Sequence, residues 1–300
     1  MNCLIVTNPY AATSSLKEKA LRLEEELHAR GISFKTLDTS YLTLILNDSE
    51  AAFREELKSF DFGLYLDKDK YIGRAIERIF PLFNSAQATE ICDDKTLTYM
   101  ALLGSHIRTP KTIPAPLCYS QPLAEPMQRF LNTVERELGY PLVCKEAYGS
   151  LGKQVYLGRD RAELESTYLR LAHVTHLYQK FIGTRIDHGE DFRVITIGGK
   201  TVASMKRIND GDFRSNLGCG GHAIRVDHLP EEISAMAERV SRLLKVDYAG
   251  VDIALDCEGL PTLLEVNSNA FFKGIESTSG VDVAGQLVDW CLHSLNAVKK

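Results

Sequence analysis

Short apolar segments alternate with amphipathic ones through the first 85 residues, and this alternation limits the fold more than any other feature of the chain. The apolar segments predict strands, and apolar side chains three and four residues apart predict helices between them. The strands are expected at residues 4–7, 32–37 and 62–66, and the helices at residues 15–31, 50–58 and 71–82. A helix that connects two strands returns the chain to the same edge of the sheet, so that the strands become parallel. We therefore predict a small α/β unit with a parallel sheet at residues 1–85.

The rest of the chain has a different pattern, in which strands follow one another more closely. Gly198-Gly199 between two apolar segments is a two-residue hairpin signal, which predicts antiparallel pairing. A polar link at residues 183–191 separates this hairpin from the strands before it. Further strands are expected at residues 112–114, 142–145, 154–157, 177–182, 192–197, 200–206, 251–255 and 262–266, and helices from about residues 93, 160, 230 and 282. The expected fold class is therefore α/β (α+β), with a parallel sheet first and antiparallel or mixed sheets later.

The composition excludes several classes of protein. Hydrophobic residues make up 44% and charged residues 25% of the 300 residues, which is typical of a globular chain rather than a disordered one. A net charge of −5 gives no overall attraction to nucleic acid or to an anionic membrane. The longest apolar stretches, such as residues 42–46, are far shorter than the roughly 20 residues that span a bilayer.

The N-terminal residues and the cysteines indicate the cellular compartment in which the protein is expected. The first residues lack the basic start and the long apolar core of a signal peptide. The seven cysteines are scattered and contain no Cys-x-x-Cys pair, which favours a reducing environment. We therefore expect a cytoplasmic protein without a nucleic acid or membrane partner, and assembly into a homo-oligomer stays open.

The predicted hairpin at residues 251–267 contains the most informative pair of acidic residues. If its turn is centred on Glu258-Gly259, Asp252 lies directly opposite Glu265, and Asn267 projects from the same face. The Cβ atoms of the two residues would then lie about 5 Å apart between apolar neighbours, and the repulsion of the carboxylates requires a positive charge. Carboxylate and amide oxygens suit a hard divalent cation, above all Mg²⁺. The alternative is a solvated strand face with a nearby lysine or arginine.

Two lysines have unusual positions. Lys95 falls in the first turn of its predicted helix, where a cation opposes the helix dipole, although Asp93 and Asp94 would neutralise it. Lys145 ends an apolar strand just before the turn Gly149-Ser150-Leu151-Gly152. The N–H groups of such a turn can bind a phosphate, to which a lysine adds a point charge. The same four residues also suit an ordinary hairpin turn.

A glycine-rich stretch at residues 209–221 carries three polar side chains in succession. They are Arg214, Ser215 and Asn216, and Arg193 and Arg207 precede them on the predicted hairpin. Three arginines that converge on such a loop could bind anionic oxygens in a bidentate manner. The alternative is a flexible surface loop with solvated charges.

Together these motifs resemble the ATP-grasp superfamily, specifically the RimK-type (alpha-L-glutamate ligase-like) carboxylate–amine ligases. The similarity extends from about residue 92 to residue 290. Its most specific segments are Gly211-Asp-Phe-Arg-Ser-Asn-Leu, Ala249-Gly-Val-Asp-Ile253, Leu264-Glu-Val-Asn267 and residues 274–285. The resemblance implies an ATP-grasp fold of three parts: an N-terminal α/β domain at 1–85, a central lid domain at 86–184 and a C-terminal catalytic domain at 185–300.

The resemblance also implies a role for each candidate residue, with ATP held between the lid and the C-terminal domain. Lys95 and Lys145 would contact the α- and β-phosphates, and the turn with Gly149, Ser150 and Gly152 would close over them. Gln179, Lys180, Phe181 and Ile182 would border the adenine, and Asp191 would face the ribose. Arg214, Ser215 and Asn216 would lie at the terminal phosphate. Asp252, Glu265 and Asn267 would hold Mg²⁺, with two ions expected and Mn²⁺ as a substitute.

The chemistry that the resemblance implies has two steps. A substrate carboxylate attacks the γ-phosphate of ATP to give an acyl phosphate, and the amine of an amino acid or peptide then displaces phosphate to form an amide. Arg193 and Arg207 would orient the acyl phosphate or its carboxylate precursor. The chain departs from the family after Asn267, where Ser268-Asn-Ala-Phe-Phe272 replaces the usual turn. This segment borders the expected acceptor site, so the departure bears on specificity for glutamate.

Two other functions stay open on the sequence. An ATP-grasp kinase would stop after phosphoryl transfer to a hydroxyl of a small molecule, and a nucleotide-binding regulator would not turn ATP over. The presence of Asp252, Glu265 and Asn267 together argues against a regulator, because binding alone could survive the loss of one ligand.

Overall fold

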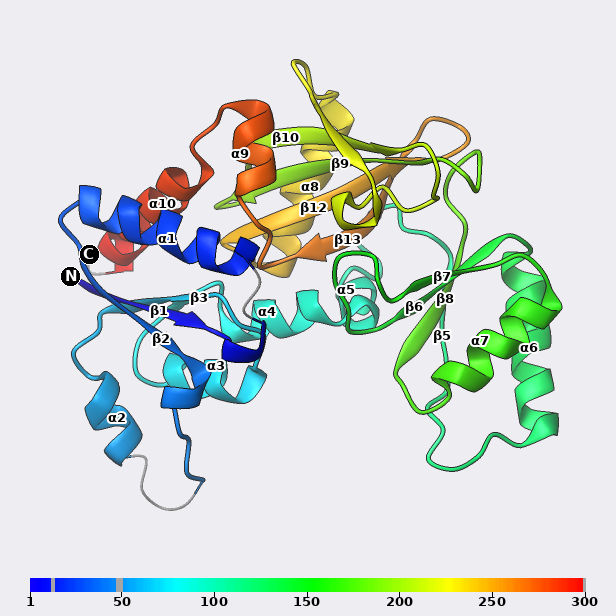
Figure 1. The fold of residues 1–300 in the computed structure, drawn as a ribbon, viewed down its shortest axis with the longest axis horizontal. Helices are drawn as coiled ribbons and strands as arrows, with labels where there is room; N and C mark the ends of the chain where they lie inside the picture. The colour runs from blue at the N-terminus through cyan, green and yellow to red at the C-terminus, as the bar shows by residue number, and fades with distance from the viewer. Residues whose placement is uncertain (12–13, 47–50, 299–300) are drawn as a thin grey trace.

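Three β-sheets organise the computed structural model, which describes residues 1–300 except residues 12–13, 47–50 and 299–300 (Figure 1). In Figure 1 the N-terminal sheet lies at the lower left, the sheet of the expected lid at the right, and the C-terminal sheet above and between them. The mixed α/β class expected from the sequence is confirmed. Within the described residues, every helix falls short of the length and apolar character that a membrane span requires.

The N-terminal sheet is parallel, as the alternation of strands and helices predicts. Its strand order is β2-β1-β3-β4. The strands are β1 (Asn2–Thr7), β2 (Ser33–Asp38), β3 (Phe62–Tyr65) and β4 (Leu82–Phe83), and the helices are α1 (Ser14–Ala29), α2 (Ala51–Leu57) and α3 (Lys70–Glu77). Strand β4 takes the place of the end of the helix expected at 71–82, because Pro81 cannot continue a helix. Residue 50, the first of the helix expected at 50–58, lies outside the described residues.

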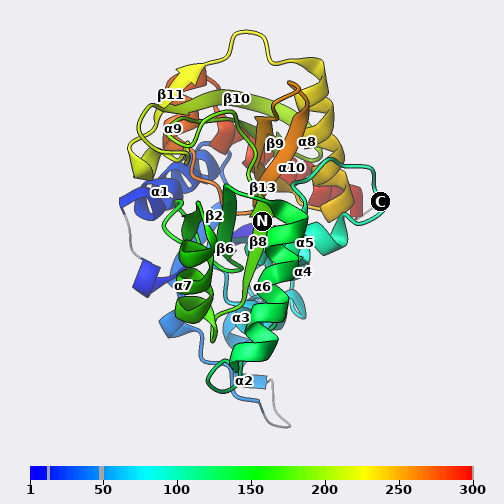
Figure 2. The same ribbon diagram turned by 90° about the vertical axis from the view of Figure 1, so that its right-hand side faces the viewer.

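The lid sheet is antiparallel and has the order β5-β8-β6-β7. Its elements are β5 (Thr112–Pro114), α6 (Ala124–Leu138), β6 (Leu142–Glu146), β7 (Val155–Gly158), α7 (Arg161–Leu171) and β8 (His176–Lys180). Figure 2 shows α6 and α7 in front of β6 and β8, so that both helices cover one face of the sheet. Helix α6 is not among the expected elements, although its buried residues recur at helical spacing. They are Met127, Leu131, Val134 and Leu138.

The C-terminal sheet is antiparallel, with the order β11-β10-β9-β12-β13. Its elements are β9 (Gly189–Ile197), β10 (Lys200–Asn209), β11 (His222–Arg225), α8 (Glu231–Leu244), β12 (Tyr248–Leu255), β13 (Pro261–Asn267), α9 (Lys273–Ser279) and α10 (Val283–Val298). The hairpin expected at Gly198-Gly199 is confirmed, because Ile197 pairs with Lys200 and both glycines have positive φ angles, +56° and +72°. Strand β11 and helix α9 are additional to the expected elements.

Alternate side chains of the C-terminal sheet enter two different hydrophobic cores. Val194, Val251 and Ile253 face helix α8 and pack against its buried residues, such as Val240. On the opposite face, residues such as Ile195 and Tyr248 share a core with α9, α10, helix α1 and strands of the N-terminal sheet. The N-terminal and C-terminal units are therefore joined by one continuous core rather than by a linker.

Helices α4 (Ala86–Asp93) and α5 (Lys95–Ala101) connect the N-terminal sheet to the lid. Both pack on the C-terminal sheet, since Ala88, Cys92 and Leu102 share a core with Val251 and Leu263. The sequence-based division assigns these residues to the lid domain at 86–184, whereas their packing joins them to the C-terminal sheet. The division into three domains stays a prediction.

Candidate active site

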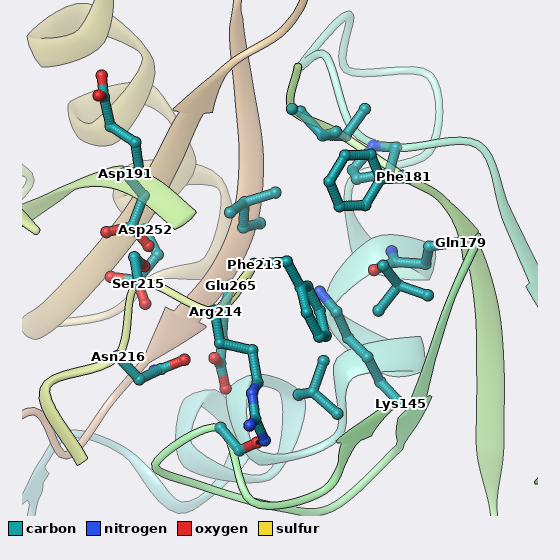
Figure 3. A pocket seen from close by; sticks show the side chains of 18 of the residues that line it. Lys145, Gln179, Phe181, Asp191, Phe213, Arg214, Ser215, Asn216, Asp252 and Glu265 are labelled. Atoms are coloured by element: carbon teal, nitrogen blue, oxygen red, sulfur yellow. Dashed lines mark hydrogen bonds between the residues drawn. The ribbon is translucent and has the colours of Figure 1, made fainter. Parts of the chain in front are cut away.

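A cavity of about 470 Å³ lies between the lid sheet and the C-terminal sheet (Figure 3). Residues of β6 and β8 line it from the lid, and residues of β9, β12 and β13 line it from the C-terminal sheet. In Figure 3, Lys145, Gln179 and Phe181 lie on one side of the cavity, and Asp191 and Asp252 lie on the other. Residues that are far apart in the sequence therefore meet here.

Most of the residues expected from the sequence line this cavity. They are Lys95, Lys145, Gly149, Ser150, Gly152, Gln179, Lys180, Phe181, Ile182, Asp191, Arg207, Arg214, Ser215, Asn216, Asp252 and Glu265. Arg193 and Asn267 are not part of the lining. Arg193 binds Asp252, which lines the cavity, and Asn267 follows Glu265 by two residues on β13. The structure thus brings the candidates together, while the chemical role of each stays a prediction.

The two acidic residues are paired across the strands as expected from the sequence. Asp252 on β12 is the cross-strand partner of Glu265 on β13, as expected. The register shifts directly after Asp252, where Ile253 pairs with Leu263. On its other side Asp252 is the partner of Arg193 on β9. A basic residue and two acidic ones therefore occupy one row across three strands, on the same face of the sheet.

Two arginine side chains, Arg193 and Arg207, contact the Asp252 carboxylate. The side chain is 2% exposed, and its Oδ2 accepts hydrogen bonds from Nη2 of Arg193 at 2.7 Å and from Nη2 of Arg207 at 2.8 Å. Nε of Arg193 also donates to Oδ1. Burial disfavours the charged carboxylate, but Arg193 and Arg207 outweigh it, so that the pKa of Asp252 is lowered.

These contacts correct one step of the sequence-based reasoning. The repulsion between Asp252 and Glu265 does not require a metal ion, because Arg193 and Arg207 neutralise Asp252 and Nζ of Lys95 lies 3.2 Å from Glu265. Arg193 lies on β9 and Arg207 on β10. The sequence of the β12–β13 hairpin does not indicate that these two strands bring arginines to Asp252. The case for a cation therefore depends on the donor atoms and on the family, and it stays a prediction.

The side-chain oxygens of Asp252, Glu265 and Asn267 are of the type that binds a hard cation, although they do not form a cluster of three His, Cys, Asp or Glu side chains. Within the part of the chain that the structure describes, no three His, Cys, Asp or Glu side chains are grouped to hold a metal. Asp252 and Glu265 supply carboxylate oxygens at the cavity, and the Glu265 side chain is 29% exposed. Oδ1 of Asn267 accepts a hydrogen bond from the Asn269 N–H at 2.9 Å. Two carboxylates and one amide oxygen are ligands that Mg²⁺ accepts.

Two lysines, Lys95 and Lys145, contribute positive charge to the cavity. Lys95 is buried, and its Nζ also donates to the Gly149 carbonyl oxygen at 3.0 Å. Burial lowers the pKa of Lys145 to about 8, while Glu265 acts in the opposite direction. Asp94 caps helix α5 by accepting hydrogen bonds from two N–H groups of its first turn.

Asp191 is part of a buried ion pair. Nε of Arg207 donates to its Oδ1 at 2.7 Å, and Nη2 of Arg207 donates to its Oδ2. Both side chains are nearly inaccessible to solvent. The ribose contact expected of Asp191 therefore has to compete with Arg207 for the same oxygen atoms.

The turn at residues 149–152 is held against the loop of the C-terminal sheet. Nη1 of Arg214 donates to the Gly152 carbonyl oxygen at 3.0 Å, and Sγ of Cys219 contacts the Leu151 carbonyl oxygen at 3.4 Å. Gly152 has a φ of +73°, and a Cβ at this position would lie 2.7 Å from Oδ1 of Asn216. Glycine is therefore required here by both the backbone conformation and the space.

Apolar and aromatic side chains also line the cavity. The centroids of the Phe181 and Phe213 rings lie 6.4 Å apart, and Val143 and Leu264 are part of the same lining. Gln179 is 1% exposed and donates from Nε2 to Oγ1 of Thr112 at 2.8 Å. Its buried Oε1 has no hydrogen-bond partner among the described residues. A cavity that combines apolar side chains with lysines fits a nucleotide.

Several cavity residues are absent from the sequence-based set. Phe213 and Leu264 lie inside two of the four segments that carry the family resemblance, so that their proximity to the site could have been inferred. His188 and Glu190 lie beside Asp191 at the start of β9. Residues of the β12–β13 turn, such as Cys257, also line the cavity, and no pattern in the sequence points to them.

Comparison with known proteins gives consistent results. The family model of the RimK-like ATP-grasp domain matches residues 92–291. The chain is 31% identical over 232 residues to N-acetylaspartylglutamate synthase A from Homo sapiens, which covers 76% of this chain and 57% of that protein. It is 32% identical over 286 residues to a probable alpha-L-glutamate ligase from Aeromonas salmonicida (strain A449), with 90% of both chains covered. The chain spans little more than half the length of the first of these relatives.

Solved structures with the same fold support this comparison. The D-alanine–D-alanine ligase from Bacillus anthracis in complex with ATP has a TM-score of 0.72 at 18% identity, over 99% of this chain and 98% of that one. A RimK domain protein ATP-grasp from Sphaerobacter thermophilus DSM 20745 has a TM-score of 0.68 at 19% identity, over 97% and 100% of the two chains. At this level of identity the likeness concerns the fold alone.

Proposed function

The chain belongs to the RimK-like ATP-grasp family, and on this premise we propose that it is an ATP- and Mg²⁺-dependent ligase that joins a carboxylate to an amine. The observation that carries the proposal is the cavity between the lid and the C-terminal sheet. It collects two lysines, an apolar slot and the Asp252–Glu265 pair, which come from segments as distant as residues 95 and 265. Relatives named as a glutamate ligase and an N-acetylaspartylglutamate synthase support an amino acid or peptide as the substrate class.

In this proposal ATP lies along the cavity. The adenine occupies the part of the cavity bordered by Gln179, Lys180, Phe181 and Ile182. Lys95 and Lys145 bind the α- and β-phosphates, and Arg214, Ser215 and Asn216 lie at the terminal phosphate. The turn at residues 149–152 covers the phosphates and is held by Arg214.

Asp252, Glu265 and Asn267 are proposed to hold two Mg²⁺ ions, for which Mn²⁺ can substitute. The ions, when bound, neutralise charge on the phosphate oxygens and place the γ-phosphate for attack. Glu265 lines the cavity with a side chain that is 29% exposed, whereas Asp252 is almost inaccessible. Arg193 and Arg207 hold Asp252 in place and supply positive charge next to it.

The reaction follows from this arrangement in two steps. The substrate carboxylate attacks the γ-phosphorus of ATP, which breaks the bond to the β-phosphate oxygen and gives ADP and an acyl phosphate. The amine then attacks the acyl carbon and displaces inorganic phosphate, which leaves an amide. Lys95, Lys145 and Arg214 stabilise the negative charge that spreads over the transferred phosphoryl group. No side-chain nucleophile of the protein takes part.

Two assays test the proposal. The ligase should release ADP only in the presence of a suitable carboxylate, and hydroxylamine should trap the acyl phosphate as a hydroxamate. Mass spectrometry of the products from an amino-acid and peptide library would identify the substrates. A phosphorylated hydroxyl compound as the product would instead favour an ATP-grasp kinase, and nucleotide binding without turnover would favour a regulator.

Because its cysteines are free thiols in the described structure, we also propose that the protein acts in the cytoplasm.

A further inference from the structure

Arg214 lies on the wall between two cavities. It lines the cavity of the candidate active site, and it also lines a second cavity of about 690 Å³. Residues of β7 and α7 bound the second cavity on the lid side, and residues 211–214 of the loop after β10 bound it on the other. A long side chain in this position has open space on both sides. Other contacts are therefore needed to keep the Arg214 guanidinium where the phosphates are proposed to bind.

The Asp212 carboxylate holds this guanidinium in one orientation. Oδ1 of Asp212 accepts a hydrogen bond from Nε of Arg214 at 3.0 Å, and Oδ2 accepts one from Nη2 at 2.6 Å. Oδ1 also accepts one from the backbone N–H of Arg214 at 2.8 Å. Two parallel bonds between a carboxylate and a guanidinium fix both the position and the plane of the arginine. The bonds from Arg214 lower the pKa of Asp212, so that the carboxylate is ionised at neutral pH.

A further contact joins Arg214 to the lid and leaves part of its guanidinium free. Nη1 donates to the Gly152 carbonyl oxygen at 3.0 Å. A guanidinium has five N–H groups. The bonds to Asp212 and Gly152 use three of them, which leaves one N–H on Nη1 and one on Nη2 without a partner among the described residues. Because the rest of the group is fixed, these two N–H groups can bind phosphate oxygens without rearrangement.

Asn209 holds the backbone of the same loop. It is the last residue of β10 and is 6% exposed. Its Nδ2 donates to the carbonyl oxygens of Arg214 and Cys219, both at 2.9 Å, and its Oδ1 accepts from the Gly211 N–H at 3.2 Å. Both N–H groups of the amide and its oxygen are thus used inside the loop. One buried side chain therefore ties the start of the loop to Arg214 and to the returning segment.

We propose that Asp212 and Asn209 are positioning residues for phosphoryl transfer. Asn209 fixes the backbone that carries Arg214, and Asp212 directs its guanidinium to the terminal phosphate of ATP. The inference rests on the proposed ligase function, and it assigns neither residue a contact with ATP. A carboxylate beside a phosphate site repels the phosphates, so an Asp212 without a positioning role would only hinder binding. Its removal should therefore preserve or improve ATP binding, whereas the loss of positioning should slow the chemical step.

The substitution Asp212→Asn separates these two effects. Asn keeps the size of the side chain but loses the ion pair, and Arg214 can then turn into the second cavity. The kcat should fall by about 10- to 100-fold, the scale expected when a reacting or stabilising group is misplaced by about 1 Å, while the KM for ATP should not rise. ADP release is measured with MgATP and the substrate pair that reacts fastest in an amino-acid and peptide library. Titration calorimetry with ADP should give the wild-type affinity, because the rest of the nucleotide site is unchanged.

A double-mutant cycle shows whether Asp212 acts through Arg214. Arg214→Ala removes the stabilising group itself and should lower kcat by about 100- to 1000-fold. Adding Asp212→Asn to this variant should change kcat by less than about twofold, because no guanidinium remains to be positioned. Asp227→Asn is the matched control. Asp227 accepts a hydrogen bond from Nε of Arg225, also two residues away, but both side chains are mostly exposed and neither lines a cavity described here. Its kcat should equal that of the wild type.

Asn209→Asp provides a second, independent variant. It keeps the shape of the side chain and the acceptor for the Gly211 N–H, but it places a carboxylate oxygen against the carbonyl oxygens of Arg214 and Cys219. The kcat should fall by about tenfold or more. Amide hydrogens of residues 210–221 should exchange faster than in the wild type, as measured by mass spectrometry. If this variant does not fold, Asp212→Asn still decides, because the Asp212 side chain is 25% exposed.

Different results would overturn the two proposals. If Asp212→Asn keeps the wild-type kcat, or raises the KM for ATP at unchanged kcat, Asp212 does not position Arg214. If Asp212→Asn costs the same factor in kcat with and without Arg214, it acts independently of the arginine, and the positioning role is again wrong. If the wild type releases no ADP with any member of the library, the ligase function itself is wrong, and the positioning role falls with it.

Discussion

The substitution Asp252→Asn tests the role of Asp252 in protein stability, separately from its proposed role in metal binding. Asp252 accepts hydrogen bonds from Arg193 and Arg207, and Arg193 has no other carboxylate partner among the described residues. The side chain of Arg193 is 14% exposed, so the substitution leaves a largely buried guanidinium without a counter-charge. Breaking one partner of a buried pair costs about 3–5 kcal/mol. With about 2–4 °C per kcal/mol, we expect Asp252→Asn to lower the melting temperature by roughly 10 °C.

The assay is thermal and denaturant unfolding, monitored by circular dichroism, with Glu258→Gln as the control. Glu258 is an exposed residue at the tip of the same hairpin, and its substitution should change the stability by less than about 0.5 kcal/mol. Since the folded-state pKa of Asp252 is lowered, its contribution is present above the unfolded-state pKa of about 3.9 and is lost as the pH falls further. An Asp252→Asn variant as stable as the wild type at pH 7 would refute the claim that the arginines depend on this carboxylate.

Three further predictions concern the cavity. Glu265→Ala should abolish turnover and leave the fold intact, because the Glu265 side chain is 29% exposed and Lys95 keeps its hydrogen bond to the Gly149 carbonyl oxygen; wild-type rates in this variant would remove Glu265 from the metal site. Because burial lowers the pKa of Lys145 to about 8 and phosphates bind the charged form, ATP affinity should decrease as the pH rises above 8; titration calorimetry of Lys145→Arg should show no such decrease. Gly152→Ala should weaken ATP binding about tenfold, since its φ of +73° and the contact with Asn216 both disfavour a Cβ. Gly139→Ala, with a positive φ but open space, is the control, and equal effects of the two substitutions would contradict this explanation.

The local features of the fold could be predicted because they depend on neighbours in the sequence. The alternation of strands and helices predicts the parallel sheet, and the positive φ angles of Gly198 and Gly199 follow from their hairpin turn. The pairing of Asp252 with Glu265 agrees with the expected register only because of the shift after Asp252: the pairs nearest the turn, such as Leu255 with Pro261, are offset by one residue from a turn centred on Glu258-Gly259. The sheet and the glycine turn therefore follow from short segments, whereas this pair does not.

The partners of the acidic residues could not be predicted in the same way. Strand β9 lies between β10 and β12, and this order depends on packing against α8 and α10 rather than on any local pattern. Only this order places Arg193 and Arg207 beside Asp252 and makes a metal ion unnecessary for its neutralisation. The register shift after Asp252 is a similar case, since the turn position alone predicts an uninterrupted ladder.

The contact between Lys19 and Asn269 is the clearest example of long-range structure. Lys19 and Asn269 are 250 positions apart and meet only because α1 packs against the C-terminal unit. Lys19 lies three residues after Leu16 and four before Leu23, on the apolar face of α1, so the helical spacing indicates its burial but not its partner Asn269. Its environment becomes visible only when the two units are seen together.

In the proposed reaction the substrate carboxylate attacks ATP at the γ-phosphate. A substrate labelled with ¹⁸O in its carboxylate reports on this step, because the attacking oxygen stays with the phosphoryl group when the amine displaces it. We expect ADP and inorganic phosphate that carries one ¹⁸O atom for each amide formed, as measured by mass spectrometry. Label in AMP, or amide formation with unlabelled phosphate, would contradict it.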